Sequence, residues 1–194
     1  MKEGDRNNKF FHAKALERKR KNKIWEIENA QGQWTENIED VEKEFCEYFQ
    51  NSFTTSSPSQ SHIQNALRGM LPKVTLETND YLEELFTIEE IVEALSQICP
   101  TKALGPDGLL AAFFQKHWQT VHGGVLGACF HILNKQGNLV VFNHTYIALI
   151  PKTSKLRKVT EFRSISLCNV IYRIVVKTIA NRLKSILSQI ISPT

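Results

Sequence analysis

The stretch from residue 169 to residue 191 is the feature that most constrains the fold of this chain. It reads "NVIYRIVVKTIANRLKSILSQII" and contains no proline, glycine or acidic residue. Its apolar residues recur with the period of an α-helix and its cations fall on the opposite face. The apolar set is Val175, Ile179, Leu183 and Ile186, and the basic set is Arg173, Lys177 and Lys184. The pattern predicts one long amphipathic helix.

The segments just before this helix alternate in polarity. "NHTYIALI" and "FRSISL" are both typical of β-strands, and the loop between them contains Pro151 and several cations. Further upstream, "LLAAFFQKHWQTVHGGVLGACFHILNKQG" predicts two helices broken near Gly123 and Gly124. Thr87 and Glu90 have the spacing of a capping box at the start of another helix. "CPTKALGPDG" carries two prolines and two glycines, which predicts a loop.

The N-terminal half has a different organisation. Residues 1–55 predict a helix, a short hairpin around "IWEIENAQGQW", and an amphipathic helix around "IEDVEKEFCEYFQNSF". Residues 56–86 begin with "SSPSQS" and predict a Ser/Thr-rich linker. Residues 87–194 then predict the main folded part. With 42% apolar residues the chain can bury a core, yet its apolar runs are far shorter than the roughly 20 residues that span a bilayer. We therefore expect no membrane partner, and the absence of an apolar leader predicts a protein that is not secreted.

Charge is strongly segregated along the chain. Residues 1–25 hold nine Lys and Arg against three acids, and residues 26–99 hold three against fifteen. Residues 151–194 hold nine Lys and Arg against one acid, Glu161. Two basic ends that flank an acidic middle favour a polyanion partner such as nucleic acid. The alternative is that these charges lie on solvated helix faces and pair within the chain.

The chemistry available in the sequence is limited. None of the six histidines has metal-ligand spacing, the four cysteines are scattered, and neither a phosphate-binding P-loop nor a Gly-x-Ser-x-Gly elbow occurs. We expect no metal site and no catalytic residue within the chain. Two-metal phosphoryl transfer needs at least two carboxylates close together. Asp107 is the last Asp of the chain, so the basic C-terminal part has the cations of a phosphate site without carboxylates for metal ions.

Four blocks of the sequence together resemble one known family. "GDRNNKFFH", "KALGPDGLLAAFFQKHW", "NHTYIALIPK" and "EFRSISLCNVIYRIVVKTIANRLKSILSQIISPT" occur in this order in the chain. In order and spacing they are similar to plant LINE-type (non-LTR) retrotransposon reverse transcriptases, over nearly the whole chain. The family usually has Pro where this chain has Leu104 and Ser164. Losing proline loosens a preset backbone angle but removes no charge.

The resemblance implies a fold and a set of binding residues. The fold is α+β and mostly α: a helical N-terminal extension and the small antiparallel finger sheet of a reverse transcriptase. The family's motifs place Lys152 and Arg163 at the triphosphate of the incoming deoxynucleotide. Other residues are expected to contact RNA template or DNA primer: Lys102, Gly105, Asp107, Gly108, Lys155, Arg157, Lys158, Arg173 and Lys177. The alternative for Lys152 and Arg163 is that both are solvent-facing charges at strand ends.

The resemblance also implies what this stretch does not carry. The palm, with its metal-binding Asp motifs, would follow in the family, so we expect a fragment of an RNA-directed DNA polymerase that is inactive by itself. The complete enzyme would use Mg²⁺, whereas the fragment would need no cofactor. The family implies a nuclear location, and a cytoplasmic one stays open. Two alternatives remain: a non-catalytic nucleic-acid-binding module, and a pseudogene product without function.

Overall fold

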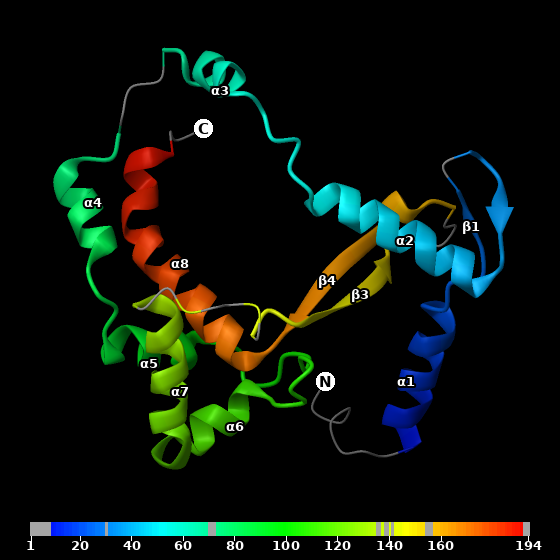
Figure 1. Ribbon diagram of the computed structural model, residues 1–194. Coiled ribbons are helices and arrows are strands. Elements are labelled where there is room, and N and C mark those ends of the chain that lie inside the picture. Colours follow the sequence, from blue (N-terminus) through cyan, green and yellow to red (C-terminus); the bar gives the residue numbers. More distant parts are fainter. Residues whose placement is uncertain are drawn as a thin grey trace. The chain divides into compact units, whose positions relative to one another are not determined.

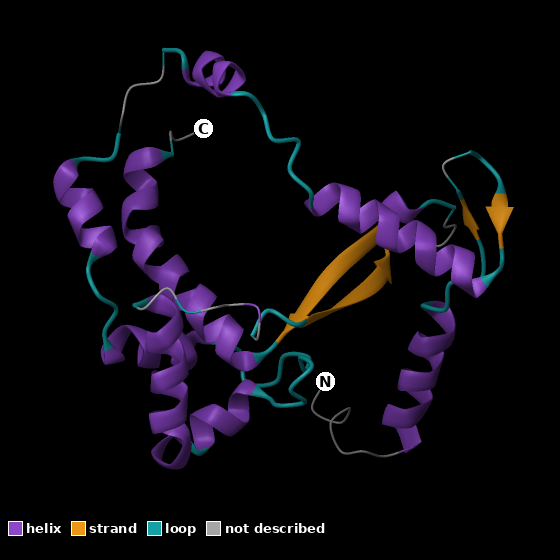
Figure 2. Ribbon diagram, in the orientation of Figure 1, coloured by secondary structure: helices purple, strands orange, loops and turns teal. Residues whose placement is uncertain are grey.

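The chain is mostly helical and carries two small antiparallel sheets of two strands each (Figures 1 and 2), which confirms the predicted fold class. A computed structural model describes residues 9–29, 31–69, 73–134, 137, 140, 142–153 and 157–191. The helices are α1 (Lys9–Lys21), α2 (Ile38–Phe53), α3 (Gln60–Leu67), α4 (Leu76–Glu83), α5 (Ile88–Gln97), α6 (Ala111–Lys116), α7 (Trp118–Leu133), the 3₁₀ turn η2 (Val159–Glu161) and α8 (Val170–Ile190). The strands are β1 (Ile27–Glu28), β2 (Trp34–Thr35), β3 (Thr145–Pro151) and β4 (Phe162–Cys168).

The chain divides into two compact units. Unit 1 contains residues 1–66 and 148–165, and unit 2 contains residues 67–147 and 166–194. The strands β3 and β4 each begin in one unit and end in the other, so the chain passes between the units along this pair. The range 56–86, in which the composition predicts a linker, contains α3 and α4. None of the described helices is long and apolar enough to cross a membrane.

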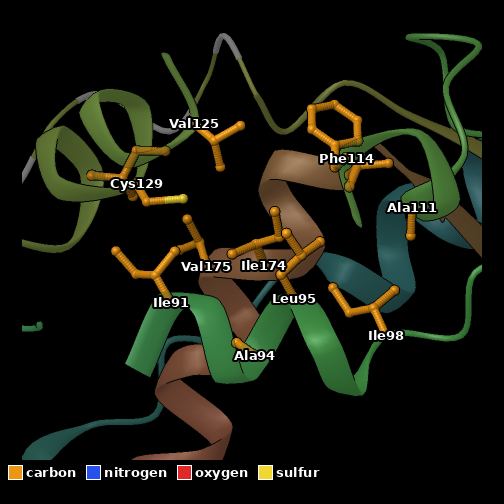
Figure 3. Packing of buried hydrophobic residues seen from close by; sticks show 12 residues of the cluster. Ile91, Ala94, Leu95, Ile98, Ala111, Phe114, Val125, Cys129, Ile174 and Val175 are labelled. Carbon is orange, nitrogen blue, oxygen red and sulfur yellow. The ribbon is translucent and has the colours of Figure 1, made fainter. Parts of the chain in front are cut away.

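Unit 2 has a core built by α5, α6, α7 and α8 (Figure 3). Ile91 and Ala94 of α5 and Ile174 of α8 are fully shielded from water, as is Cys129 of α7. Helix α5 begins with the predicted capping box: Thr87 Oγ1 accepts from Glu90 N, and Glu90 Oε2 accepts from Thr87 N at 2.9 Å. The two orphan N–H groups at this helix end are thereby satisfied.

The break between α6 and α7 is not where the glycines predicted it. Helix α7 runs through Gly123 and Gly124 without interruption, and the chain turns instead at His117. Each glycine costs a helix about 1 kcal/mol relative to alanine. Burial of Val125 and Cys129 in the core, on the next turn of the same helix, outweighs this cost.

Helix α8 forms in one piece, as predicted, and its buried face contains only part of the predicted apolar set, namely Val175 and Ile186. The buried side chains of α8 are those of Val170, Ile174, Val175, Thr178, Arg182 and Ile186, of which the first three belong to the hydrophobic core cluster. Ile179 and Leu183, the other two members of that set, are 39% and 41% exposed. The buried face also includes a polar residue, Thr178, and a charged residue, Arg182. The helical period of apolar residues could not indicate them, because it counts only apolar side chains.

Arg182 is the charged residue on this buried face, and it is 5% exposed. Its Nε and Nη2 donate to the two carboxylate oxygens of Glu90 at 2.9 and 2.7 Å. The guanidinium also lies 3.6 Å from the ring centre of Phe86. Its remaining N–H groups donate to three carbonyls at the end of α4 and in the loop after it, those of Leu82, Glu84 and Leu85. One side chain thus joins α8 to α4, to the capping box of α5 and to the loop between them.

We expect Arg182→Met to lower the free energy of unfolding by about 3 kcal/mol, because it leaves the carboxylate of Glu90 and three backbone carbonyls without their hydrogen-bond donor. Burial alone would raise the pKa of Glu90, but the hydrogen bond from Arg182 and the N–H of Thr87 outweigh burial and hold it below its usual value. The Glu90–Arg182 pair therefore stabilises the fold above the usual carboxyl pKa, and this contribution is lost as pH falls through the lowered value.

Urea titrations of wild type and Arg182→Met between neutral and acidic pH would measure both effects. Lys184→Met, an exposed change on the same helix, is the matched control and should shift the unfolding free energy by less than about 0.5 kcal/mol. Equal stability of the two variants at neutral pH would contradict the role assigned to Arg182.

Unit 1 has a smaller core. Phe45 of α2 and Phe162 of β4 meet edge to face with ring centres 5.2 Å apart. Ile27 of β1 and Val159 of η2 are buried beside them. The predicted hairpin is present, with Ile27 opposite Thr35 across the β1–β2 pair. The packing joins the amphipathic helix near the N-terminus to the β3–β4 end of the chain, so this unit is not continuous in sequence.

One side of α8 exposes a stripe of apolar residues: Val176, Ile179, Leu183 and Leu187, each between 39% and 44% exposed. Contiguous apolar surface of this kind promotes association in water. We expect the double variant Leu183→Gln/Leu187→Gln to stay monodisperse at concentrations at which the wild type self-associates, with little change in unfolding midpoint. Sedimentation velocity over a concentration series would show the difference. Identical concentration dependence of the two proteins would contradict it.

Candidate nucleic-acid interface

Figure 2 shows the strands of the β3–β4 pair. Of the two cations predicted to bind triphosphate, Arg163 lies in β4 and Lys152 directly follows Pro151, the last residue of β3. Near one end of the pair, Lys152 N donates to Glu161 O at 2.9 Å. Near the other end, Thr145 Oγ1 lies 3.6 Å from Cys168 Sγ. Both contacts give the same antiparallel register, which places Arg163 opposite Ile150.

This register assigns each side chain to a face of the pair, since side chains alternate along a strand. Leu149 and Phe162 are on one face and pack into the core of unit 1. Lys152 lies two residues beyond Ile150, so Lys152 and Arg163 lie together on the other face. Both cations are exposed, and their neighbours on this face, Ile150 and Ile165, are 38% and 43% exposed. The structure therefore brings the predicted pair together on one open surface.

The two cations differ in what they contact. Lys152 Nζ donates to the carbonyl oxygen of Thr160 at 2.6 Å, which leaves two of its three N–H groups available. The side chain of Arg163 makes no hydrogen bond or ion pair with any residue that the structure describes. Arg163 is thus the more available of the two for an anion.

Cations of the loop between the strands contact other residues of the same chain. Lys155 lies outside the described residues. Arg157 is 5.9 Å from the ring centre of Trp34, and Lys158 Nζ lies 3.7 Å from Glu28 Oε1. Lys158 also lines a pocket of about 520 Å³ whose other charged residues are acidic, namely Glu28, Glu44 and Glu47. These carboxylates would repel a phosphate. Nucleic-acid binding by Lys158 therefore stays a prediction, and pairing with Glu28 is the alternative role of its charge.

Glu161, the only acidic residue in the range 151–194, stabilises the turn between the strands. Its Oε2 accepts hydrogen bonds from the backbone N–H groups of Arg157 and Lys158. These two bonds, the one from Arg157 first, lower the pKa of Glu161 below its usual value. The carboxylate therefore closes the turn at η2. Among the residues that the structure describes, no group of three or more His, Cys, Asp or Glu side chains is placed to hold a metal ion.

The "GPDG" loop docks on the N-terminal end of α8. Asp107 Oδ2 accepts from Val170 N at 3.0 Å, and Asp107 Oδ1 accepts from Leu109 N at 3.2 Å. Asp107 N in turn donates to Asn169 Oδ1 at 3.0 Å. Asn169, although it is the N-cap residue of α8, makes no side-chain capping bond of its own. Asp107 caps the helix in its place, from more than sixty residues upstream in the sequence.

The two glycines of the loop are each required for a different physical reason. A Cβ atom at Gly105 would collide with the carbonyl group of Cys168, so only glycine permits this close approach. Gly108 has φ of +66°, a conformation that other residues adopt at a cost. These contacts account for Gly105, Asp107 and Gly108 structurally. Their contact with a template strand stays a prediction.

We expect Asp107→Ala to lower the free energy of unfolding by about 1 kcal/mol, because the first turn of α8 loses its acceptor. Urea denaturation measures this loss. Asp80→Ala removes an exposed carboxylate from α4 and is the matched control, with a change below about 0.5 kcal/mol. Unchanged stability of Asp107→Ala would show that the capping bonds contribute nothing measurable to the fold.

Three of the predicted nucleic-acid contacts meet in one place. Lys102, Arg173 and Lys177 line a pocket of about 450 Å³ between the end of α5, the loop after it and α8, all within unit 2. Tyr172 and Cys99 line it as well. The sequence pattern did not single out these last two, and the only signal for Tyr172 was its place next to Arg173. The hydrogen bonds from Thr101 and the nearby charge of Lys102 lower the pKa of the Cys99 thiol below its usual value.

The chain is homologous to a segment of a transposon-encoded protein. No protein-family model matches it. The "Transposon TX1 uncharacterized 149 kDa protein" of Xenopus laevis is 33% identical to it over 196 residues, which cover 97% of this chain. The chain spans 14% of the length of that relative. The comparison confirms a relation to transposons, whereas the reverse-transcriptase and plant parts of the resemblance stay predictions.

Proposed function

We propose that this segment forms the N-terminal extension and fingers of a LINE-type reverse transcriptase of the kind found in plant retrotransposons. In this role it binds the triphosphate of the incoming deoxynucleotide during RNA-directed DNA synthesis. The observation that carries the proposal is the common exposed face of Lys152 and Arg163 on the β3–β4 pair. The relation of nearly the whole chain to a transposon protein supports it.

The chemistry of the two side chains suits a triphosphate. The guanidinium of Arg163 presents a rigid fork that can grip two phosphate oxygens, and the ammonium of Lys152 is a mobile point charge. Diagonal neighbours on an antiparallel pair lie about 7–8 Å apart at the backbone, so two long side chains can converge on adjacent phosphates. The bond from Lys152 Nζ to Thr160 O does not stand in the way, since the ammonium keeps two further donors.

Ile150 and Ile165 add an apolar surface beside the cations. Apolar surface next to an ionic contact lowers the local dielectric constant and strengthens the contact. In the proposal the "GPDG" loop lies near the RNA template strand. Catalytic carboxylates and Mg²⁺, which would activate the attacking hydroxyl and neutralise the phosphates, belong to other parts of the longer enzyme. The described residues of this chain supply the cation side of the site alone.

We expect Lys152→Met and Arg163→Gln each to weaken binding of a fluorescently labelled deoxynucleoside triphosphate by about tenfold, because each removes one charged hydrogen-bonding group. Fluorescence anisotropy on the 194-residue chain measures this affinity. Inorganic triphosphate should compete with the probe, whereas the unphosphorylated nucleoside should not.

Lys116→Met, an exposed change at the end of α6, is the matched control and should leave the affinity unaltered. Both test positions are exposed, so the unfolding midpoint should stay constant in all three variants. The proposal fails if Lys152→Met and Arg163→Gln bind the probe as tightly as Lys116→Met does.

A further inference from the structure

The pocket between α5 and α8 holds a charged group that the fold itself does not satisfy. Nε and Nη2 of Arg173 are shielded from water and have no hydrogen-bond partner among the residues that the structure describes. A buried donor without a partner costs free energy, and arginine cannot escape the cost by losing its proton. Arg182, nine residues along the same helix, shows the contrast, because all of its N–H directions meet acceptors. Arg173 therefore calls for an explanation outside the fold.

The surroundings of Arg173 point to an anion as the missing partner. Lys102 and Lys177 line the same pocket, and none of the residues that line it is an Asp or Glu. The nearest acids in sequence already have partners: Glu93 Oε1 accepts from Gln97 Nε2 at 2.9 Å, and Asp107 accepts from Val170 N and Leu109 N. Three cations thus converge without an acidic counterpart among the lining residues.

Apart from Gln97, the rest of the lining is mostly apolar, and the pocket accommodates more than a small ion. Its volume of about 450 Å³ lies in the range of about 300–1,000 Å³ that is typical of ligand sites. Tyr172 and Val176 line it beside the cations. An aromatic ring next to cations is the combination by which proteins hold a nucleotide unit of a single strand, with the base on the ring and the phosphate on the charges.

We propose that this pocket binds one nucleotide unit of a nucleic-acid strand, with its phosphate held by Arg173, Lys102 and Lys177 and its base against Tyr172. The two unpartnered nitrogens, Nε and Nη2, form one side of the guanidinium fork, the side that grips a phosphate through two parallel bonds. Both atoms are shielded from water, so the proposal requires the guanidinium to turn toward the pocket for the phosphate to reach them. The two hydrogen bonds to the phosphate would form without breaking any hydrogen bond that these two nitrogens make in the fold.

This site is separate from the triphosphate site on the β3–β4 pair. Its residues belong to unit 2, whereas Lys152 and Arg163 belong to unit 1. The two sites also differ in ligand: the pocket takes a nucleotide within a strand, and the pair takes a free triphosphate. Either site can therefore fail its test while the other holds.

The test uses the complete 194-residue chain and a labelled single-stranded oligodeoxythymidine, with binding followed by fluorescence anisotropy. We expect Arg173→Met to weaken binding by about tenfold and to reduce the slope of log affinity against log salt by about 1. Lys177→Met should weaken binding several-fold. Lys184→Met, the same kind of change on the same helix outside the pocket, should alter the affinity less than twofold.

Thermal unfolding of the same variants separates binding from a structural role. Arg173→Met removes an unsatisfied buried group, so its unfolding midpoint should stay level or rise. A large fall in the midpoint would show that Arg173 supports the fold and would overturn the proposal. Affinity equal to that of Lys184→Met in both Arg173→Met and Lys177→Met would overturn it too.

Competition identifies the source of the phosphate. Unlabelled oligonucleotide should displace the probe, whereas inorganic phosphate and a mononucleotide triphosphate should do so only at far higher concentration. Equal competition by inorganic phosphate would reduce the pocket to a simple anion site, and displacement by an acidic peptide alone would make it a protein-docking site. Each of these two results would overturn the assignment to a strand.

Discussion

The hydrogen bonds of Arg182 are the interaction on which the rest of unit 2 depends. The end of α4, the capping box of α5 and the loop between them present three carbonyls and a carboxylate to one point of α8. Short helices such as α4, with eight residues, and α5, with ten, are marginal alone. The guanidinium satisfies their end groups at once and stacks on Phe86. With α5 held in this way, its apolar residues meet those of α7 and α8 in the core (Figure 3).

Helix α8 therefore makes three kinds of contact along its length. Its N-terminal end is capped from the "GPDG" loop through Asp107, its middle is buried against α5 and α7, and Arg182 holds α4 and the start of α5. Between these contacts, Arg173 lines a pocket, and its Nε and Nη2 have no hydrogen-bond partner among the described residues. Two arginines of one helix thus contrast: the fold satisfies every donor of Arg182, whereas two donors of Arg173 have no partner in the described part of the chain. Burial and hydrogen-bond partners separate these roles, although net charge does not.

Much of the local structure could be predicted from residue patterns. The capping box of Thr87 and Glu90, the hairpin of β1 and β2 and the unbroken α8 follow from spacing and propensity within a few residues. The placement of the α6–α7 break failed, because core contacts of Val125 and Cys129 outweigh the helix cost of two glycines. The burial of Arg182 on α8 could not be predicted from the apolar period, because its acceptors come from distant segments of the chain.

For the candidate sites, the sequence by itself determined the residue types: a lysine and an arginine near the ends of two strands, and a basic helix with few acids nearby. The parity of positions along two paired strands also places Lys152 and Arg163 on one face once the register is known. Only the tertiary structure decided that register, and only it showed Lys158 beside Glu28 and Asp107 as the cap of α8. It also brought Lys102 and Arg173 to one pocket and left Nε and Nη2 of Arg173 without a partner among the described residues. The physical reason is that hydrogen-bond partners from distant segments are set by packing, whereas periodicity reports only which side chains avoid water.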